Sequence, residues 1–137
     1  MTDSSKAQAK PTMSASGSGP RVRTVLVVEN DTMVRGLAET ILGRGGYQVL
    51  SALDGQQAID MYCTSATPID VVLMDLYLPV LSGVDAMAEL RRLNPDVRVV
   101  LTSGARPDFL EPEPAVFLNK PFSPAELLAA VARALPP

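Results

Sequence analysis

Histidine and tryptophan are absent from this chain of 137 residues, and cysteine occurs once. Without histidine, the chain cannot build a Ser-His-Asp triad or a histidine-ligated metal site, and it cannot carry a phosphohistidine of its own. The lone Cys63 cannot form a disulfide within the chain, which is typical of a reducing compartment and predicts a cytoplasmic location. No apolar stretch has membrane-spanning length and the first residues show no signal-peptide pattern, so we expect no membrane association.

Basic residues are also too few for a nucleic-acid-binding surface. The chain has 12 Lys and Arg against 15 Asp and Glu, a net charge of -3 and a pI near 4.8, so we expect no nucleic-acid partner. Residues 1–20 are mostly small or polar, with almost nothing large and apolar, which predicts a disordered tail or linker. Residues 21–137 have the composition and length of one globular domain.

Apolar runs rich in β-branched residues predict five strands, at 24–28, 47–52, 71–74, 97–101 and 115–118. Apolar residues at helical spacing predict helices at 33–42, 55–62, 82–94 and 123–135. The remaining connection, 106–114, contains prolines at 107, 112 and 114, so a fourth helix there should be truncated or distorted. Strands that alternate with helices predict an α/β fold, with an open parallel sheet covered by helices on both faces.

The most informative stretch surrounds Asp75. The apolar run 71–74 suits a strand that is buried on both faces, and Asp75 follows it at once. Pro79 and Gly83 then break the chain before the next helix. A carboxylate at the carboxyl end of a central parallel strand lies where open α/β sheets place their binding sites. This stretch alone is equally consistent with Asp75 acting as a simple cap of the loop.

Polar residues follow four of the predicted strands, and the carboxyl ends of parallel strands meet at one edge of a sheet. These residues are Glu29 and Asn30, Asp75, Thr102 and Ser103, and Lys120. Oxygen ligands that follow the strands at 24–28 and 71–74 suit Mg²⁺, although acidic residues also simply favour a helix start. The hydroxyls at 102 and 103 suit either a turn or a bound anion. Lys120 is the only lysine outside residues 1–20, and its ammonium group suits a carboxylate or phosphoryl partner.

Four motifs occur in a fixed order along the chain: Val-Leu-Val-Val-Glu29-Asn30-Asp31, Met-Asp75-Leu-Tyr-Leu-Pro79-Val-Leu-Ser-Gly83, Leu-Thr-Ser103-Gly104 and Phe117-Leu-Asn-Lys120-Pro121-Phe122. In this order and spacing, the chain from about Arg23 to Leu135 resembles the receiver domains of two-component response regulators, which are CheY-like proteins. The resemblance implies a flavodoxin-like doubly wound fold with five parallel strands in the order 2-1-3-4-5.

The resemblance also implies a role for individual residues. Asp75 is the expected phosphoacceptor, which takes a phosphoryl group from the phosphohistidine of a sensor histidine kinase or phosphotransfer protein. The expected Mg²⁺ ligands are Glu29, Asn30, Asp75 and the backbone carbonyl of Tyr77. The remaining roles fall to Lys120 as the phosphoryl contact, Ser103 as the switch hydroxyl (with Thr102 as a one-residue alternative), Phe117 as the switch aromatic and Pro121 as a cis-peptide candidate.

Phosphorylation is then expected to draw Ser103 toward the phosphoryl group, so that Phe117 rotates inward and signals to an unknown downstream protein. Such a chain is not an enzyme beyond self-catalysed phosphotransfer and autodephosphorylation. Because the chain stops shortly after the last predicted helix, we expect it to act through partners or to be a fragment of a longer protein.

Two departures from the family pattern keep an alternative open. Asn30 replaces the aspartate that most receivers carry there, and the connection before residue 115 is proline-rich. The alternative is a pseudo-receiver, a constitutive protein-interaction module without efficient phosphorylation. A hydrolase that uses Asp75 as its nucleophile is disfavoured, because Tyr77 stands where such an enzyme has a second aspartate.

Overall fold

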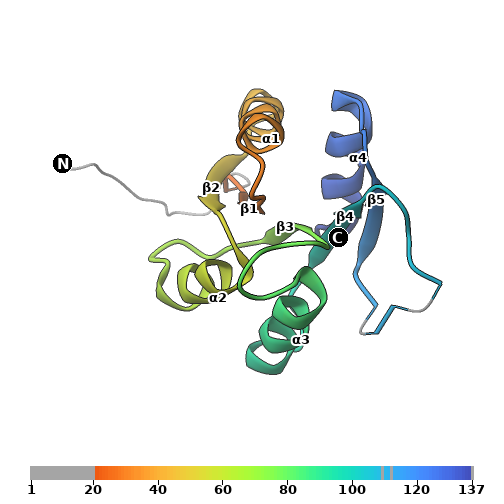
Figure 1. Cartoon of the computed structure of the whole chain (residues 1–137). Coiled ribbons are helices and arrows are strands. Elements are labelled where there is room, and N and C mark those ends of the chain that lie inside the picture. Colours follow the sequence, from red (N-terminus) through yellow and green to blue (C-terminus); the bar gives the residue numbers. More distant parts are fainter. Residues whose placement is uncertain (1–20, 109, 112, 137) are drawn as a thin grey trace.

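A computed structural model describes residues 21–136 except 109 and 112. The predicted tail at 1–20 lies outside the described residues. Five parallel strands form one sheet in the order β2-β1-β3-β4-β5, which confirms the predicted flavodoxin-like topology (Figure 1). The strands are β1 (Thr24–Val28), β2 (Gln48–Ala52), β3 (Val71–Asp75), β4 (Val99–Ser103) and β5 (Val116–Asn119).

Four helices cover the sheet: α1 (Thr32–Arg44), α2 (Gly55–Thr64), α3 (Gly83–Leu93) and α4 (Pro124–Ala134). Figure 1 shows α1 and α4 on one face and α2 and α3 on the other, as expected for a doubly wound sheet. Each helix begins at an Asp or Ser whose side chain accepts a hydrogen bond from a backbone N–H of the first turn. In α4, Ser123 and Glu126 form a capping box, in which each side chain accepts a hydrogen bond from the other residue's backbone N–H.

The central strands are buried on both faces because each face packs against two helices. Every residue of β1 and β4 is buried, and so are the four apolar residues of β3. Alternate side chains of a strand point to opposite faces, so each of these strands contributes to both halves of the core. This packing fixes the carboxyl ends of β1, β3 and β4 relative to one another.

The chain between β4 and β5 contains no helix among its described residues, 104–108, 110, 111 and 113–115. The predicted truncation is therefore complete in this part of the chain, as its prolines favour. Leu110 is buried and joins the half of the core that α2 and α3 cover. We refer to residues 104–115 below as the β4–β5 connection.

The predicted bounds of β4 were wrong by two residues. We expected a strand at 97–101, but the structure has it at Val99–Ser103. Val97 is buried like a strand residue, yet its N–H donates to the Asn94 carbonyl at 3.0 Å in a turn. As a result, Thr102 and Ser103 belong to the strand itself and are both buried.

Val80, in the loop after β3, has a backbone φ of 68°, in the left-handed region that a β-branched residue rarely adopts. Its side chain is 81% exposed, so it contributes little packing. We expect Val80→Asn to raise the free energy of unfolding by about 1 kcal/mol, because asparagine tolerates this conformation. Urea unfolding checks this, with the exposed Val22→Asn as the control. Equal effects of the two substitutions would show that Val80 is not strained.

Candidate functional site

Lys120 lies between two carboxylates at the carboxyl edge of the sheet. Its Nζ donates to Oε1 of Glu29 at 2.8 Å and to Oδ2 of Asp75 at 3.1 Å. Glu29 directly follows β1, Asp75 ends β3, and Lys120 directly follows β5. Three strand ends that are distant in the sequence therefore build one charged cluster, as the positions of these residues in the predicted strands indicated.

The charges of this cluster depend on one another because its members are largely removed from solvent. The Glu29 and Asp75 side chains are 7% and 13% exposed, and that of Lys120 is 23% exposed. Burial by itself lowers the pKa of Lys120, but the hydrogen bonds to Glu29 and Asp75 and the charges of both carboxylates outweigh it, so the pKa is raised. Lys120 therefore stays protonated at neutral pH.

Backbone groups orient the two carboxylates. The second oxygen of Glu29 accepts a hydrogen bond from the Asp31 N–H at 3.0 Å, and Oδ1 of Asp75 accepts one from the Tyr77 N–H at 3.2 Å. On the other side of the same turn, Arg35 donates from Nη1 to the Glu29 carbonyl at 3.0 Å. Each carboxylate thus has one oxygen bound to Lys120 and the other to its own loop.

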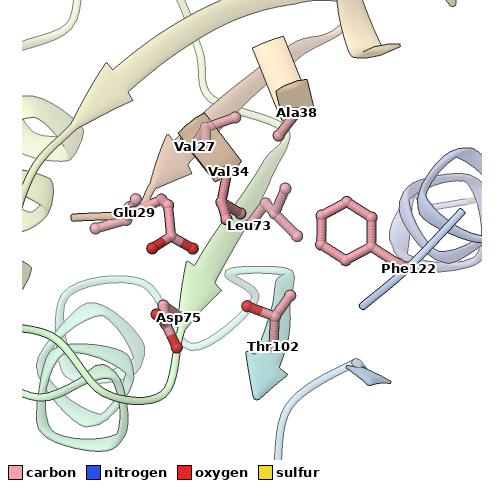
Figure 2. A pocket seen from close by; sticks show the side chains of 9 residues that line it. Val27, Glu29, Val34, Ala38, Leu73, Asp75, Thr102 and Phe122 are labelled. Carbon is pink, nitrogen blue, oxygen red and sulfur yellow. The ribbon is translucent and has the colours of Figure 1, made fainter. Parts of the chain in front are cut away.

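A pocket beside this cluster opens on the face of the sheet covered by α1 and α4. Figure 2 shows the carboxylates of Glu29 and Asp75 on one side of the pocket and the Phe122 ring on the other, with Thr102 between Asp75 and Phe122. The rest of the lining is apolar: Val27, Val28, Val34, Ala38 and Leu73. A group bound to Asp75 would thus be flanked by a carboxylate, a hydroxyl and an ammonium.

The two candidate switch hydroxyls occupy different places. Thr102 pairs with Asp75 in the sheet register and lines the pocket. Ser103 is the next residue, and its carbonyl accepts a hydrogen bond from the Lys120 N–H at 2.8 Å. Alternation along β4 places Ser103 on the same face as Leu101, and Leu101 and Phe117 pack in the same half of the core. Ser103 is therefore better placed than Thr102 to communicate with Phe117.

Asn30 and Tyr77 lie at the rim of the site, and both are exposed. Within the part of the chain that the structure describes, no three Asp, Glu, Cys or His side chains are grouped so that they can hold a metal ion. A metal ion at this site would have to be held by the two carboxylates of Glu29 and Asp75 together with neutral oxygens. Such a set fits Mg²⁺, which proteins bind through one or two carboxylates while the ion keeps several waters.

The remaining predicted residues lie close to this cluster. The Lys120–Pro121 peptide is cis, the form that the resemblance implies. Phe117 is half-buried, and the guanidinium of Arg106 lies over its ring. Sequence reasoning assigned no role to Arg106, Arg35 or Phe122, although Phe122 belongs to the fourth motif. Helical spacing from Asp31 could have indicated Arg35, whereas no sequence pattern pointed to Arg106.

The doubly wound parallel sheet defines a flavodoxin-like fold. The site at its carboxyl edge consists of two carboxylates and one lysine ammonium group, and such a cation can pair with further negative charge. Residues 25–132 match the family model described as the response regulator receiver domain. The chain belongs to this family and is therefore a receiver domain of two-component systems. No helix within residues 21–136, apart from the undescribed 109 and 112, is long and apolar enough to cross a membrane.

Individual relatives agree with this assignment. The chain is 29% identical over 115 residues to the chemotaxis protein CheY of Thermotoga maritima, covering 80% of this chain and 94% of CheY. It is 31% identical over 128 residues to hybrid signal transduction histidine kinase I of Dictyostelium discoideum, covering 85% of this chain but only 7% of that kinase. The high-resolution structure of the chemotaxis response regulator CheY4 of Vibrio cholerae shares the fold, with a TM-score of 0.75 at 23% identity, over 84% of this chain and all of CheY4.

Proposed function

We propose that Asp75 is the phosphoacceptor of this receiver domain and takes a phosphoryl group from the phosphohistidine of a sensor histidine kinase or phosphotransfer protein. The observation that carries the proposal is the position of the Asp75 carboxylate, at the end of the central strand and 3.1 Å from Lys120 Nζ. In this account the chain is a phosphoacceptor and a signalling protein, and its only catalysis is phosphotransfer to and from itself. A cytoplasmic location stays a prediction from composition.

The transfer forms a bond between an Asp75 carboxylate oxygen and phosphorus and breaks the bond between phosphorus and the donor imidazole nitrogen. Asp75 needs no general base, because an ionised carboxylate is already the nucleophile. Lys120 is positioned to pair with the oxygens of the incoming group, since catalysis of such a transfer is mostly positioning and charge neutralisation. Mg²⁺ held by Glu29, Asp75, Asn30 and the Tyr77 carbonyl would supply further neutralising charge.

The product carries a charge of about -1.5 to -2 and new hydrogen-bond acceptors beside a buried hydroxyl. The Ser103 hydroxyl can donate a hydrogen bond to a phosphoryl oxygen. To do so, the Ser103 side chain must leave its present position, on the face of β4 that packs in the same half of the core as Phe117. Phe117 is half-buried and can move inward into the space that is vacated. This movement would change the surface near β5 to which a downstream protein binds.

A constitutive interaction module remains the second candidate function, and one observation favours it. Both carboxylates of the site already pair with Lys120, and the neutral Asn30 follows Glu29 where most receivers carry an aspartate. Such a site is stable without a metal ion or a phosphoryl group. The two candidates differ in whether Asp75 is phosphorylated at all.

Incubation with acetyl phosphate and Mg²⁺, followed by intact mass measurement, tests the proposal. We expect the wild-type protein to gain the mass of one phosphoryl group and Asp75→Asn to gain none. Asp85→Asn is the matched control, because Asp85 is exposed in the first turn of α3 and should not affect uptake. Undiminished uptake by Asp75→Asn would move the acceptor elsewhere, and no uptake by the wild type would favour the constitutive module.

Asn30→Asp tests whether residue 30 is one of the proposed Mg²⁺ ligands. We expect Mg²⁺ affinity to rise by about tenfold, equivalent to about 1.4 kcal/mol, because the ion gains a third negative ligand. Added repulsion among the carboxylates should lower the free energy of unfolding in chelator by about 1 kcal/mol. Mg²⁺ titration and thermal melts measure the two effects. Gln48→Glu adds the same charge at the amino end of the sheet and should change neither. An unchanged affinity in Asn30→Asp would mean that Asn30 does not face the ion.

A further inference from the structure

Arg106, in the β4–β5 connection, contacts two groups at once. Its guanidinium carbon lies 5.1 Å from the centroid of the Phe117 ring, within the range of a cation–π contact. Its Nη2 lies 3.1 and 3.2 Å from the two carboxylate oxygens of Glu113. Arg106 therefore joins the start of the connection to its end while its guanidinium lies over the aromatic ring of β5.

One end of this arrangement contacts Ser103 of the proposed switch, and the other end contacts α3. At the start, the Ala105 N–H donates to Oγ of Ser103 at 3.4 Å, one residue before Arg106. At the end, Nη2 of Arg91 in α3 donates to the Glu113 carbonyl at 2.8 Å. A path of hydrogen bonds and chain connectivity thus leads from the Ser103 hydroxyl through Arg106 to Phe117.

The Arg106–Glu113 ion pair by itself contributes little, because its side chains are 45% and 66% exposed. The contact with Phe117 is different, since a planar guanidinium can stack on a ring in a way that a lysine ammonium cannot. In the part of the connection that the structure describes, no helix covers this ring. The arrangement is therefore better suited to orienting Phe117 than to stabilising the fold.

We propose that Arg106 is a positioning residue that holds Phe117 in its half-buried orientation and couples it to Ser103. The proposal rests on the proposed function and specifies how the switch is set. When Ser103 turns toward the phosphoryl group, it gives up the Ala105 N–H. The backbone at Arg106 is then free to shift, the guanidinium leaves the ring, and Phe117 moves inward.

The absence of tryptophan from the chain permits a direct test. Phe117→Trp introduces a single tryptophan whose accessibility is measured by acrylamide quenching, with and without acetyl phosphate and Mg²⁺. In this background, adding Arg106→Ala should lower the quenching of the unphosphorylated protein toward the phosphorylated value. The ratio of inward to half-buried rings should rise about two- to fivefold, the population change expected for a cation–π contact at an exposed site.

Three further variants separate orientation from a general loss of surface charge. Arg106→Lys keeps the charge but not the planar stack, so its quenching should lie between those of the parent and Arg106→Ala. Glu113→Gln removes the ion pair and should change quenching in the same direction by less. Arg92→Ala removes another exposed arginine that pairs with a carboxylate, Glu89, and should have no effect.

Quenching in Arg106→Ala that equals that of Arg92→Ala, with and without phosphoryl donor, would overturn the proposal. Intact mass is measured on the same samples, so a failure of phosphorylation is seen separately. In that event the proposed function fails, while the unphosphorylated proteins still report whether Arg106 orients the ring. Thermal melts of each variant confirm that the comparison is made between folded proteins.

Discussion

Gly83→Ala should lower the free energy of unfolding by about 3 kcal/mol or more, because the new methyl group would collide with backbone that cannot move aside. A Cβ at Gly83 would lie 2.2 Å from the Asp75 carbonyl oxygen and 2.9 Å from the Leu76 Cα. The Gly83 N–H also donates to the Leu76 carbonyl at 2.8 Å, so the start of α3 is held tightly to the end of β3. Relief of the collision must displace Asp75 or α3.

Urea unfolding measures this effect, and Gly36→Ala is the matched control. Gly36 lies inside α1 and a Cβ there would meet no atom within 4 Å. Its replacement should therefore raise the free energy of unfolding by about 1 kcal/mol, the helix propensity difference between glycine and alanine. The two substitutions should thus have opposite signs. A Gly83→Ala protein as stable as the wild type would show that α3 does not approach β3 so closely.

Lys120→Met should lower the free energy of unfolding by about 1–3 kcal/mol at neutral pH, because the largely buried carboxylate of Glu29 loses its cation. Asp75 loses the same partner, and the two negative charges then face each other without a counter-ion. Because part of the Lys120 side chain is exposed, solvent reduces this cost below that of a fully buried pair.

The effect should depend on pH with a definite sign. The pKa of Lys120 is raised in the folded protein. Burial acts to lower this pKa, but the hydrogen bonds to Glu29 and Asp75 and the charges of both carboxylates together outweigh burial. The stabilisation is therefore fully present below the unfolded lysine pKa of about 10.4 and is lost as pH rises through the folded value. Wild type and Lys120→Met should converge in stability above that range, because Lys120 is then uncharged in both the folded and the unfolded wild type.

Urea unfolding of both proteins at neutral pH and at pH values above about 10.4 measures this convergence. Arg92→Met is the control, because Arg92 pairs with Glu89 on an exposed part of α3, where solvent screens the pair, and its loss should leave stability nearly unchanged. A Lys120→Met protein with wild-type stability at neutral pH would show that the contacts of Lys120 with the two carboxylates do not stabilise the fold.

The fold could be predicted from the sequence because clear apolar patterns and capping residues mark most of its strands and helices. Residues 25–28 and 71–74 are unbroken apolar runs that are each followed by an acidic residue, and Ser123 with Glu126 indicates the start of α4. The start of β4 could not be predicted in the same way. Burial makes Val97 apolar whether it pairs in a sheet or ends a turn, so its residue type does not distinguish the two.

The site could be predicted only to the level of backbone position. The rule that parallel strands end at one edge brought Glu29, Asp75 and Lys120 together, and the structure shows them in contact. That one ammonium group contacts both carboxylates depends on side-chain rotamers, which periodicity does not report. The contact between Arg106 and Phe117 could not be predicted from the sequence. The β4–β5 connection follows no regular pattern from which spatial neighbours can be inferred.

Identification of the phosphorylated residue tests the central claim most directly. An acyl phosphate on a carboxylate is reduced by borohydride to an alcohol, which leaves a permanent mark on the acceptor. After treatment with acetyl phosphate and Mg²⁺, reduction and digestion, peptide sequencing by mass spectrometry should find homoserine at position 75. Reduction products at Glu29, Asp31 or another carboxylate instead of position 75, or at none, would contradict the assignment of Asp75 as the phosphoacceptor.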